Sequence, residues 1–362
     1  RAISLQREHA GADSIEVLRF QVYLGEVLYS GGEREQARRT MDGALGAMRA
    51  RLAPDDPELI SALGFQGVLL RELGEPAAAE AIFGEILAQR QVLLERDSQK
   101  IAIVHNNLGR VYYDQGRTLE AIEQYRTSYE LGAREGAQDD PSQAIDLINL
   151  GSLYEEVGDY PEALDHMRRG VAIFERHADE VGFLLALARQ NLGRLLMLAG
   201  EANESRQWLE LPIADTDDAD WAMERGRQRI HLADWQRRYG AAAEAQRWLA
   251  AAEANLQDIG GAQSPRVAAI ERIRGQLALA RGEHDAAQAD LESARARLQA
   301  ARGERYVGVG ELDLELAGVA LARGDRSAAR ELLGDARTIL DPVLAPTAPQ
   351  RERLAALERE AR

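Results

Sequence analysis

The chain has 362 residues, and 60 acidic against 44 basic side chains give it a formal net charge of −16. That charge disfavours unselective binding to DNA, RNA or an anionic membrane surface. There is no cysteine, which excludes disulfides, thiol catalysis and zinc ribbons. No uninterrupted apolar run approaches the roughly 18 residues that a membrane-spanning helix needs. We therefore expect no nucleic-acid partner and no membrane insertion by this segment.

A glycine recurs along the chain, six times at an interval of 42 residues and once at an interval of 40. Five residues after each glycine stands a small side chain, and four residues later a large apolar one. The recurring glycines are Gly32, Gly74, Gly116, Gly158, Gly200, Gly240, Gly282 and Gly324. Seven residues before each stands a second small residue, namely Gly25, Gly67, Gly109, Gly151, Gly193, Ala233, Gly275 and Ala317. Such fixed spacing is typical of a repeat array rather than of one globular core.

The third unit carries the pattern in full. It reads Leu108-Gly109-x-x-Tyr112, followed by Gly116, Ala121 and Tyr125. This string resembles the tetratricopeptide pattern L-G-x-x-Y followed by A-x-x-x-F. The small residues suit places where two helices approach closely, and the turn glycine suits a left-handed helix end. The longer unit of this chain resembles those of kinesin light chains and of bacterial peptide-sensing proteins.

The resemblance implies an all-α fold, a right-handed α-α superhelix of eight helix-pair units over residues 13–342. Residues 1–12 are expected to end a truncated upstream unit, and residues 343–362 to form a C-terminal capping helix. Three sites predict helix starts, because an acid or serine caps the helix and proline takes its first position. They are Asp55-Asp56-Pro57, Asp139-Asp140-Pro141 and Ser264-Pro265.

The interval of 40 residues falls at an irregular junction between the fifth and sixth units. Pro212 is followed by alternating aspartates over residues 215–220, which resemble a calcium loop. The loop's glycine is absent at the sixth position, and Gly226 replaces its glutamate at the twelfth. A shortened second helix followed by an acidic helix cap is the simpler interpretation. Four tryptophans lie near this junction and either fill the core or form an exposed patch, namely Trp208, Trp221, Trp235 and Trp248.

The sequence carries no motif for catalysis. Phosphate-binding loops, zinc-protease helices and the serine nucleophile elbow are all missing. The six histidines are scattered, and the many neighbouring carboxylates are interpreted as solvated helix faces. We therefore predict no catalytic residue, no metal site and no cofactor, so these residues are not expected to form an enzyme.

Recognition is the remaining role, and in tetratricopeptide arrays the first helix of each unit lines a concave groove. Two residues before the second small column, three consecutive units place asparagine. Its amide both donates and accepts, so it can pair with a peptide main chain. One residue after the column, two units place arginine. With polar neighbours these residues make up the predicted groove, namely Asn106, Asn107, Arg110, Asn149, Ser152, Gln190, Asn191, Arg194, Arg227, His231 and Arg238.

We expect the partner to be a protein or an extended peptide. A basic stripe on an acidic chain fits an acidic peptide or a free carboxylate, although the lysines of the family's carboxylate clamp are absent. Composition and repeat type resemble the C-terminal regions of bacterial serine/threonine kinases. That resemblance implies a sensory or scaffolding role in a signalling protein, in either cytoplasm or periplasm. A self-associating homo-oligomer and a stand-alone peptide-sensing regulator are the alternatives.

Overall fold

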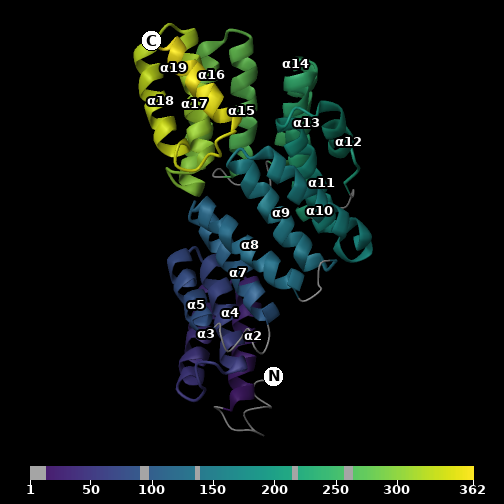
Figure 1. Ribbon diagram of the computed structural model, residues 1–362, viewed down its shortest axis with the longest axis vertical. Coiled ribbons are helices and arrows are strands. Elements are labelled where there is room, and N and C mark those ends of the chain that lie inside the picture. Colours follow the sequence, from purple (N-terminus) through teal and green to yellow (C-terminus); the bar gives the residue numbers. More distant parts are fainter. Residues whose placement is uncertain (1–13, 90–97, 135–138, 214–218, 257–263) are drawn as a thin grey trace. The chain divides into compact units, whose positions relative to one another are not determined.

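A computed structural model describes residues 14–89, 98–134, 139–213, 219–256 and 264–362. Within these ranges every regular element is a helix and there is no strand (Figure 1), which confirms the predicted all-α repeat fold. The chain divides into two compact units, Arg1–Gln138 and Asp139–Arg362. The eight repeat boundaries and the terminal segments that the sequence predicts stay predictions, and residues 1–12 lie outside the described ranges.

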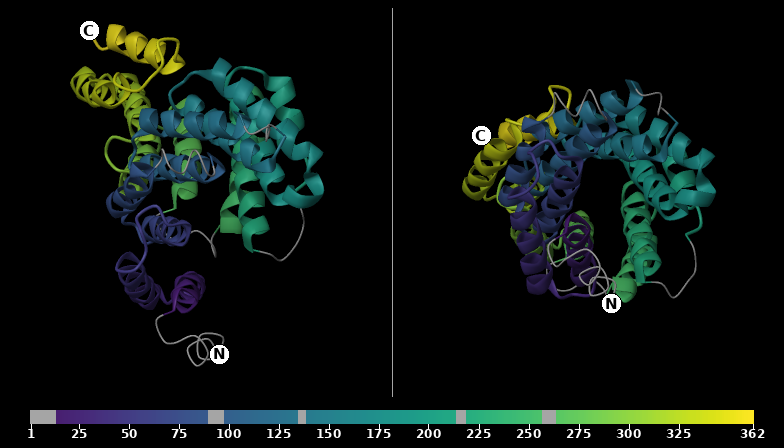
Figure 2. Two further views of the ribbon diagram at one scale, coloured as in Figure 1. Left: turned by 60° about the horizontal axis from the view of Figure 1, so that its bottom comes forward. Right: turned by 90° about the horizontal axis from the view of Figure 1, so that it is seen from below.

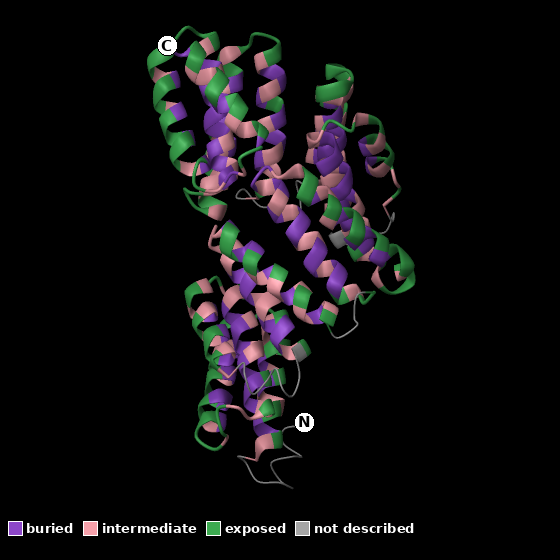
Figure 3. Ribbon diagram, viewed as in Figure 1, coloured by how far each residue is buried: buried purple, intermediate pink, exposed green. Residues whose placement is uncertain are grey.

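Consecutive helices pack against one another in both units. The first unit contains α2 (Ile15–Ser30), α3 (Arg34–Arg49), α4 (Pro57–Glu72), α5 (Pro76–Ala88), α7 (Ser98–Asp114) and α8 (Thr118–Arg134). The second unit contains α9 (Pro141–Glu156), α10 (Tyr160–Arg176), α11 (Ala178–Leu198), α12 (Ala202–Leu209), α13 (Ala219–Tyr239), α14 (Ala242–Leu256), α15 (Pro265–Ala280), α16 (His284–Arg302), α17 (Val307–Ala322), α18 (Arg326–Leu340) and α19 (Pro349–Glu360). In Figure 3 buried residues lie along the helix faces that meet other helices, and exposed residues lie along the outer faces.

The recurring glycine ends the first helix of a pair in a left-handed turn at seven positions. Their φ angles lie between 71° and 88°, at Gly32, Gly74, Gly116, Gly158, Gly200, Gly282 and Gly324. Gly240 is the exception, and the left-handed end expected there is wrong. At that turn the Gln236 side chain accepts a hydrogen bond from the Ala241 amide at 3.3 Å. The side-chain amide therefore takes part in a chain reversal that elsewhere depends on glycine geometry.

The second small column lies where the two helices of a pair touch. A Cβ atom added at Gly67 would stand 2.6 Å from Cζ of Phe83, and one at Gly109 would stand 2.9 Å from the Tyr125 ring. The same conflict recurs with the large apolar residue 16 positions later at Gly25, Gly151, Gly193 and Gly275. The missing side chain therefore makes room for the large residue of the second helix, as the sequence spacing predicts.

The predicted helix starts are present. Asp56 accepts a hydrogen bond from the Glu58 amide at 2.9 Å, and Asp140 accepts one from the Ser142 amide at 2.8 Å. Ser264 does the same for Arg266 at 3.3 Å. In each case proline occupies the first turn of the helix, where its lack of an amide proton costs nothing.

We expect Asp140→Ala to lower the free energy of unfolding by about 1 kcal/mol, because it removes the cap of α9. Hydrogen bonds from the side chain and backbone of Ser142 hold the pKa of Asp140 below its ordinary value. The contribution of the carboxylate is therefore present above the unfolded-state pKa and is lost as pH falls through the folded-state pKa. Asp140→Asn keeps a neutral cap and is the control. Urea denaturation between pH 7 and pH 3 should show the loss of this contribution in the parent but not in the asparagine variant. Parallel pH profiles would contradict the assignment.

The segment that ends the chain returns to the first helix pair of the second unit. The Ala345 amide donates a 2.8 Å hydrogen bond to the Val157 carbonyl, at the turn between α9 and α10. A Cβ atom added at Gly158 would lie 2.5 Å from Cβ of Ala348. Arg351 holds the segment's own loop through the carbonyls of Leu344 and Ala345, among others. In both views of Figure 2 the yellow α19 lies beside α17 and α18, the helices it contacts.

One helix of the described ranges is long and apolar enough to cross a membrane by length and composition. It is α11, and 44% of its most apolar stretch is buried inside the structure. Its apolar run in the sequence is interrupted by Arg189, Gln190, Asn191 and Arg194. A core helix meets the same criterion, and α11 packs against α10, α12 and α13.

Candidate binding site of the second unit

Six ionisable side chains from the first helices of successive pairs form what we call the charged cluster. Its members are Glu155 of α9, Arg194 of α11, Glu224, Arg227 and His231 of α13, and Arg266 of α15. Three of these residues belong to the predicted groove, namely Arg194, Arg227 and His231. The structure therefore brings together residues that lie far apart in the sequence, and it adds three that the sequence analysis did not select.

Glu155 is the acidic end of the charged cluster. Its side chain is 6% exposed, and one carboxylate oxygen forms an ion pair with Arg194. The other oxygen, Oε2, is buried and has no hydrogen-bond partner among the described residues. Burial raises the pKa of Glu155, and Arg194 opposes that rise. The carboxyl group thus presents an acceptor that protein groups leave unpaired.

Arg227 and Glu224 lie one turn apart on α13. Nη2 of Arg227 stands 2.6 Å from Oε2 of Glu224, and the two groups form an ion pair. Nε of Arg227 is also buried and unpartnered within the described ranges, as is Nε of Arg266, whose Nη2 lies 3.7 Å from Glu224. Burial lowers the pKa of Arg227, although a guanidinium stays charged in proteins. Glu224 therefore attracts both arginines, while the Nε atom of each has no hydrogen-bond partner among the described residues.

His231 is a buried histidine that lies near the arginines of the charged cluster. Its ring is 8% exposed, and Nδ1 has no partner in the part of the chain that is described. Burial lowers the pKa of His231 well below its usual value, and the charges of Arg194 and Arg227 lower it further. The imidazole is therefore neutral near pH 7.

Unpaired buried groups make the charged cluster unusual. Leaving one such donor or acceptor unsatisfied costs about 1–3 kcal/mol, and native proteins keep only a few. Here four side-chain atoms are in this condition, namely Oε2 of Glu155, Nε of Arg227, Nδ1 of His231 and Nε of Arg266. A ligand with both donors and acceptors suits this set of atoms.

The remaining predicted residues of this unit are less closely tied to the cluster. Asn149 and Asn191 are half-buried. Ser152 donates its hydroxyl to the Ile148 carbonyl of its own helix at 2.9 Å. Arg238 is exposed and pairs with Asp234 at 3.1 Å. Gln190 is buried and lines a separate pocket.

Three predicted groove residues belong to the first unit. Asn106 and Asn107 are half-buried on α7, and Arg110 on the same helix is exposed. They are therefore described apart from the charged cluster. The aspartates of the calcium-like loop at positions 215, 217 and 218 lie outside the described residues.

The interpretation of carboxylates as solvated helix faces is wrong for several acids. Glu155 and Glu224 are 6% and 3% exposed, and Asp313 and Glu315 are more deeply buried still. Position within the repeat contained part of the missing signal. Glu224 and Arg266 both stand nine residues before the small column, at Ala233 and Gly275. Glu155 stands four residues after that column, at Gly151, and shares no such position with them.

Comparison with protein-family models matches the tetratricopeptide repeat at residues 60–85 and 100–176. This chain carries a tetratricopeptide-repeat array. No curated protein matches it in sequence.

Solved structures resemble most of the chain in fold. The match to the apo form of RapI covers 78% of this chain and 98% of the RapI chain, at 14% identity and a TM-score of 0.63. The match to the Rap conjugation gene regulator of plasmid pLS20, in complex with the Phr* peptide, covers 95% of this chain and 97% of the regulator, at 9% identity and a TM-score of 0.58. The match to a putative kinesin light chain from Podosopora anserina covers 62% of this chain and 99% of the kinesin light chain, at 18% identity and a TM-score of 0.48. At these identities the likeness to the two Rap structures shows a helical-repeat fold.

Proposed function

We propose that this tetratricopeptide array is a non-catalytic module that binds an extended protein segment through the charged cluster of its second unit. The observation that carries the proposal is the convergence of buried, unpaired donors and acceptors from α9, α13 and α15. A polypeptide main chain offers both kinds of group at every residue. The peptide in the complex of the pLS20 regulator supports the same kind of ligand for a fold of this type.

Charge favours a segment with an acidic side chain. Arg194, Arg227 and Arg266 approach one another closely enough for each to affect the pKa of Arg227 or His231. A carboxylate placed among them would form charge-assisted hydrogen bonds with the guanidinium groups of Arg227 and Arg266, whose Nε atoms have no partner among the described residues. Main-chain amides of the same segment would donate to Glu155 and Glu224. Asn149 and Asn191 would pair with its backbone on neighbouring helices.

Selection from a display library of random twelve-residue peptides tests this proposal. We expect selected sequences to be enriched in aspartate and glutamate, and Arg227→Gln to weaken their binding at least about tenfold, because truncating one partner of a desolvated charged contact is costly. Fluorescence anisotropy with labelled peptides measures the dissociation constant. Arg168→Gln is the matched control, because Arg168 forms an exposed ion pair with Glu204 on second helices.

The double variant Asn149→Ala with Asn191→Ala gives a second test of the same site. It should weaken binding without lowering the thermal unfolding temperature. Equal affinity for the parent, the Arg227→Gln variant and the asparagine double variant would refute the proposal. A melting curve for each variant separates lost binding from lost structure.

Association with a kinase domain, a role in signalling and self-association come from resemblance or from the sequence alone. They remain predictions. Sequencing of the coding region upstream of Arg1 tests the first two, and light scattering over a range of protein concentrations tests the third.

A further inference from the structure

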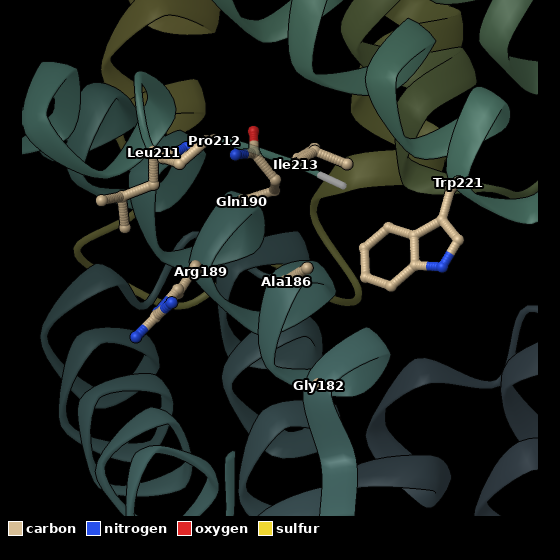
Figure 4. A pocket seen from close by; sticks show the side chains of 8 residues that line it. All are labelled: Gly182, Ala186, Arg189, Gln190, Leu211, Pro212, Ile213 and Trp221. Atoms are coloured by element: carbon tan, nitrogen blue, oxygen red, sulfur yellow. The ribbon is translucent and has the colours of Figure 1, made fainter. Parts of the chain in front are cut away.

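A second polar feature of the second unit is a pocket of about 120 Å³ beside α11 (Figure 4). Small residues of α11 and an apolar stretch after α12 form most of its wall. The lining includes Ala186, Arg189, Gln190, Pro212, Ile213 and Trp221. The charged cluster and the tetratricopeptide pattern leave this pocket without a role.

Two sets of contacts build the pocket walls. Nε2 of Gln228 donates hydrogen bonds of 2.7 Å to the carbonyls of Leu209 and Leu211, which fixes the stretch that enters one wall. The ring of Trp221 packs edge-to-face on Phe183, with centroids 5.1 Å apart and planes at 86°. Side chains held in this way give a preformed site rather than a gap between mobile loops.

Gln190 gives the pocket a hydrogen-bond acceptor, beside Arg189, whose Nε atom is also buried and has no partner among the described residues. Gln190 is 1% exposed, and its Oε1 atom has no hydrogen-bond partner within the described part of the chain. In Figure 4 its amide extends toward Pro212 and Ile213, whereas the guanidinium of Arg189 points away. A buried acceptor in apolar surroundings is costly unless a donor reaches it. The pocket therefore suits an apolar body that ends in a hydrogen-bond donor.

Size and charge limit what that body is. A closed cavity of about 150 Å³ lined by apolar side chains binds benzene, so a partly open pocket of about 120 Å³ accepts one six-membered ring rather than an indole. A lysine would bring a charge into an apolar site next to Arg189. A phenol combines a ring of the right size with an O–H donor.

We propose that this pocket binds the phenol ring of a tyrosine in the captured segment, with its hydroxyl donating to Oε1 of Gln190. This inference rests on the proposed function for the origin of the tyrosine. Gln190 and Arg194 lie one turn apart on α11, a rise of about 5.4 Å. An extended peptide advances about 3.3 Å per residue, so the acidic residue that meets Arg194 stands about two positions from the tyrosine.

Titration with 4-methylphenol, the side chain of tyrosine, tests the pocket without any peptide. The chain has four tryptophans, so its indole N–H signals are few in an NMR spectrum and Trp221→Phe assigns the relevant one. We expect 4-methylphenol to shift the Trp221 signal saturably and toluene to bind about fivefold more weakly, since it lacks the hydroxyl. Gln190→Leu should abolish that difference, and Ala186→Leu should fill the pocket and weaken both ligands. No saturable shift, or equal affinity for the two probes, overturns the inference.

Peptides from the display selection separate this inference from the proposed function. Enrichment of tyrosine two positions from an acid, and weaker binding after tyrosine is changed to phenylalanine, supports both. Acidic peptides that bind without tyrosine, together with no effect of 4-methylphenol on Trp221, refute the pocket and leave the function standing. Saturable binding of 4-methylphenol with no selected peptide supports the phenol site and refutes the proposed function.

Discussion

Gly158→Ala is expected to lower the free energy of unfolding by about 3 kcal/mol, more than the same change at any other turn glycine of the second unit. Two effects add. A non-glycine residue at φ 77° carries backbone strain of about 1–2 kcal/mol, and the new Cβ would stand 2.5 Å from Cβ of Ala348, a case of overpacking that costs about 1–3 kcal/mol. Chemical denaturation followed by circular dichroism measures the change.

Gly200→Ala is the matched control for Gly158→Ala. Its φ is 88°, but nothing lies within 4 Å of the added Cβ atom, so it should show the backbone strain alone. Ala348→Gly introduced into Gly158→Ala should recover most of the difference between the two variants. If both alanine variants lose equal stability, or if Ala348→Gly rescues nothing, the return of the C-terminal segment to the α9–α10 turn is wrong.

Phe83→Ala is expected to lower the free energy of unfolding by about 3–5 kcal/mol, through lost burial and the cavity left behind. The side chain is 0% exposed, and its ring fills the space that Gly67 leaves open on the facing helix. The effect should belong to the first unit, because a repeat array gains its stability from neighbouring helix pairs. Thermal unfolding of the full chain should therefore gain or broaden a low-temperature transition.

The effect of Gly67→Ala on the free energy of unfolding is the control for this prediction, because its sign should differ between the parent and the Phe83→Ala variant. Gly67→Ala should destabilise the parent, since its Cβ would collide with the Phe83 ring. In the Phe83→Ala background the same change should stabilise by up to about 1 kcal/mol, because the ring is gone and alanine favours a helix over glycine. Destabilisation of the same size in both backgrounds would show that the two positions do not share one space.

The features that sequence reasoning predicted depend on contacts within one repeat. The small column and the residue 16 positions later face each other across a helix pair, so their spacing recurs and is visible without a structure. Helix starts such as Asp140-Pro141 are more local still, because cap and proline act on the first turn of the same helix. The all-α fold follows from these short-range rules.

The features that sequence reasoning missed depend on contacts that do not recur. Gly240 occupies the same place in its repeat as the other turn glycines, but its φ is not positive. At that turn the side chain of Gln236 accepts a hydrogen bond from the Ala241 amide. Glu155 and Glu224 are indistinguishable by residue type from the many solvated acids of this chain, and only the approach of Arg194 and Arg227 marks them. Gln190 was predicted as a groove residue, but its pocket was not, because that pocket needs the irregular stretch after α12 as its wall.

The hydrogen bond from Ala345 to Val157 alters how the second unit opens. In a linear array the terminal repeats have one neighbour each, so amide protons at the ends exchange with solvent first. Here the last segment has a second neighbour, the turn between α9 and α10. Local opening of α19 must therefore break a contact of the first helix pair as well, and exchange protection at the two ends of this unit becomes coupled.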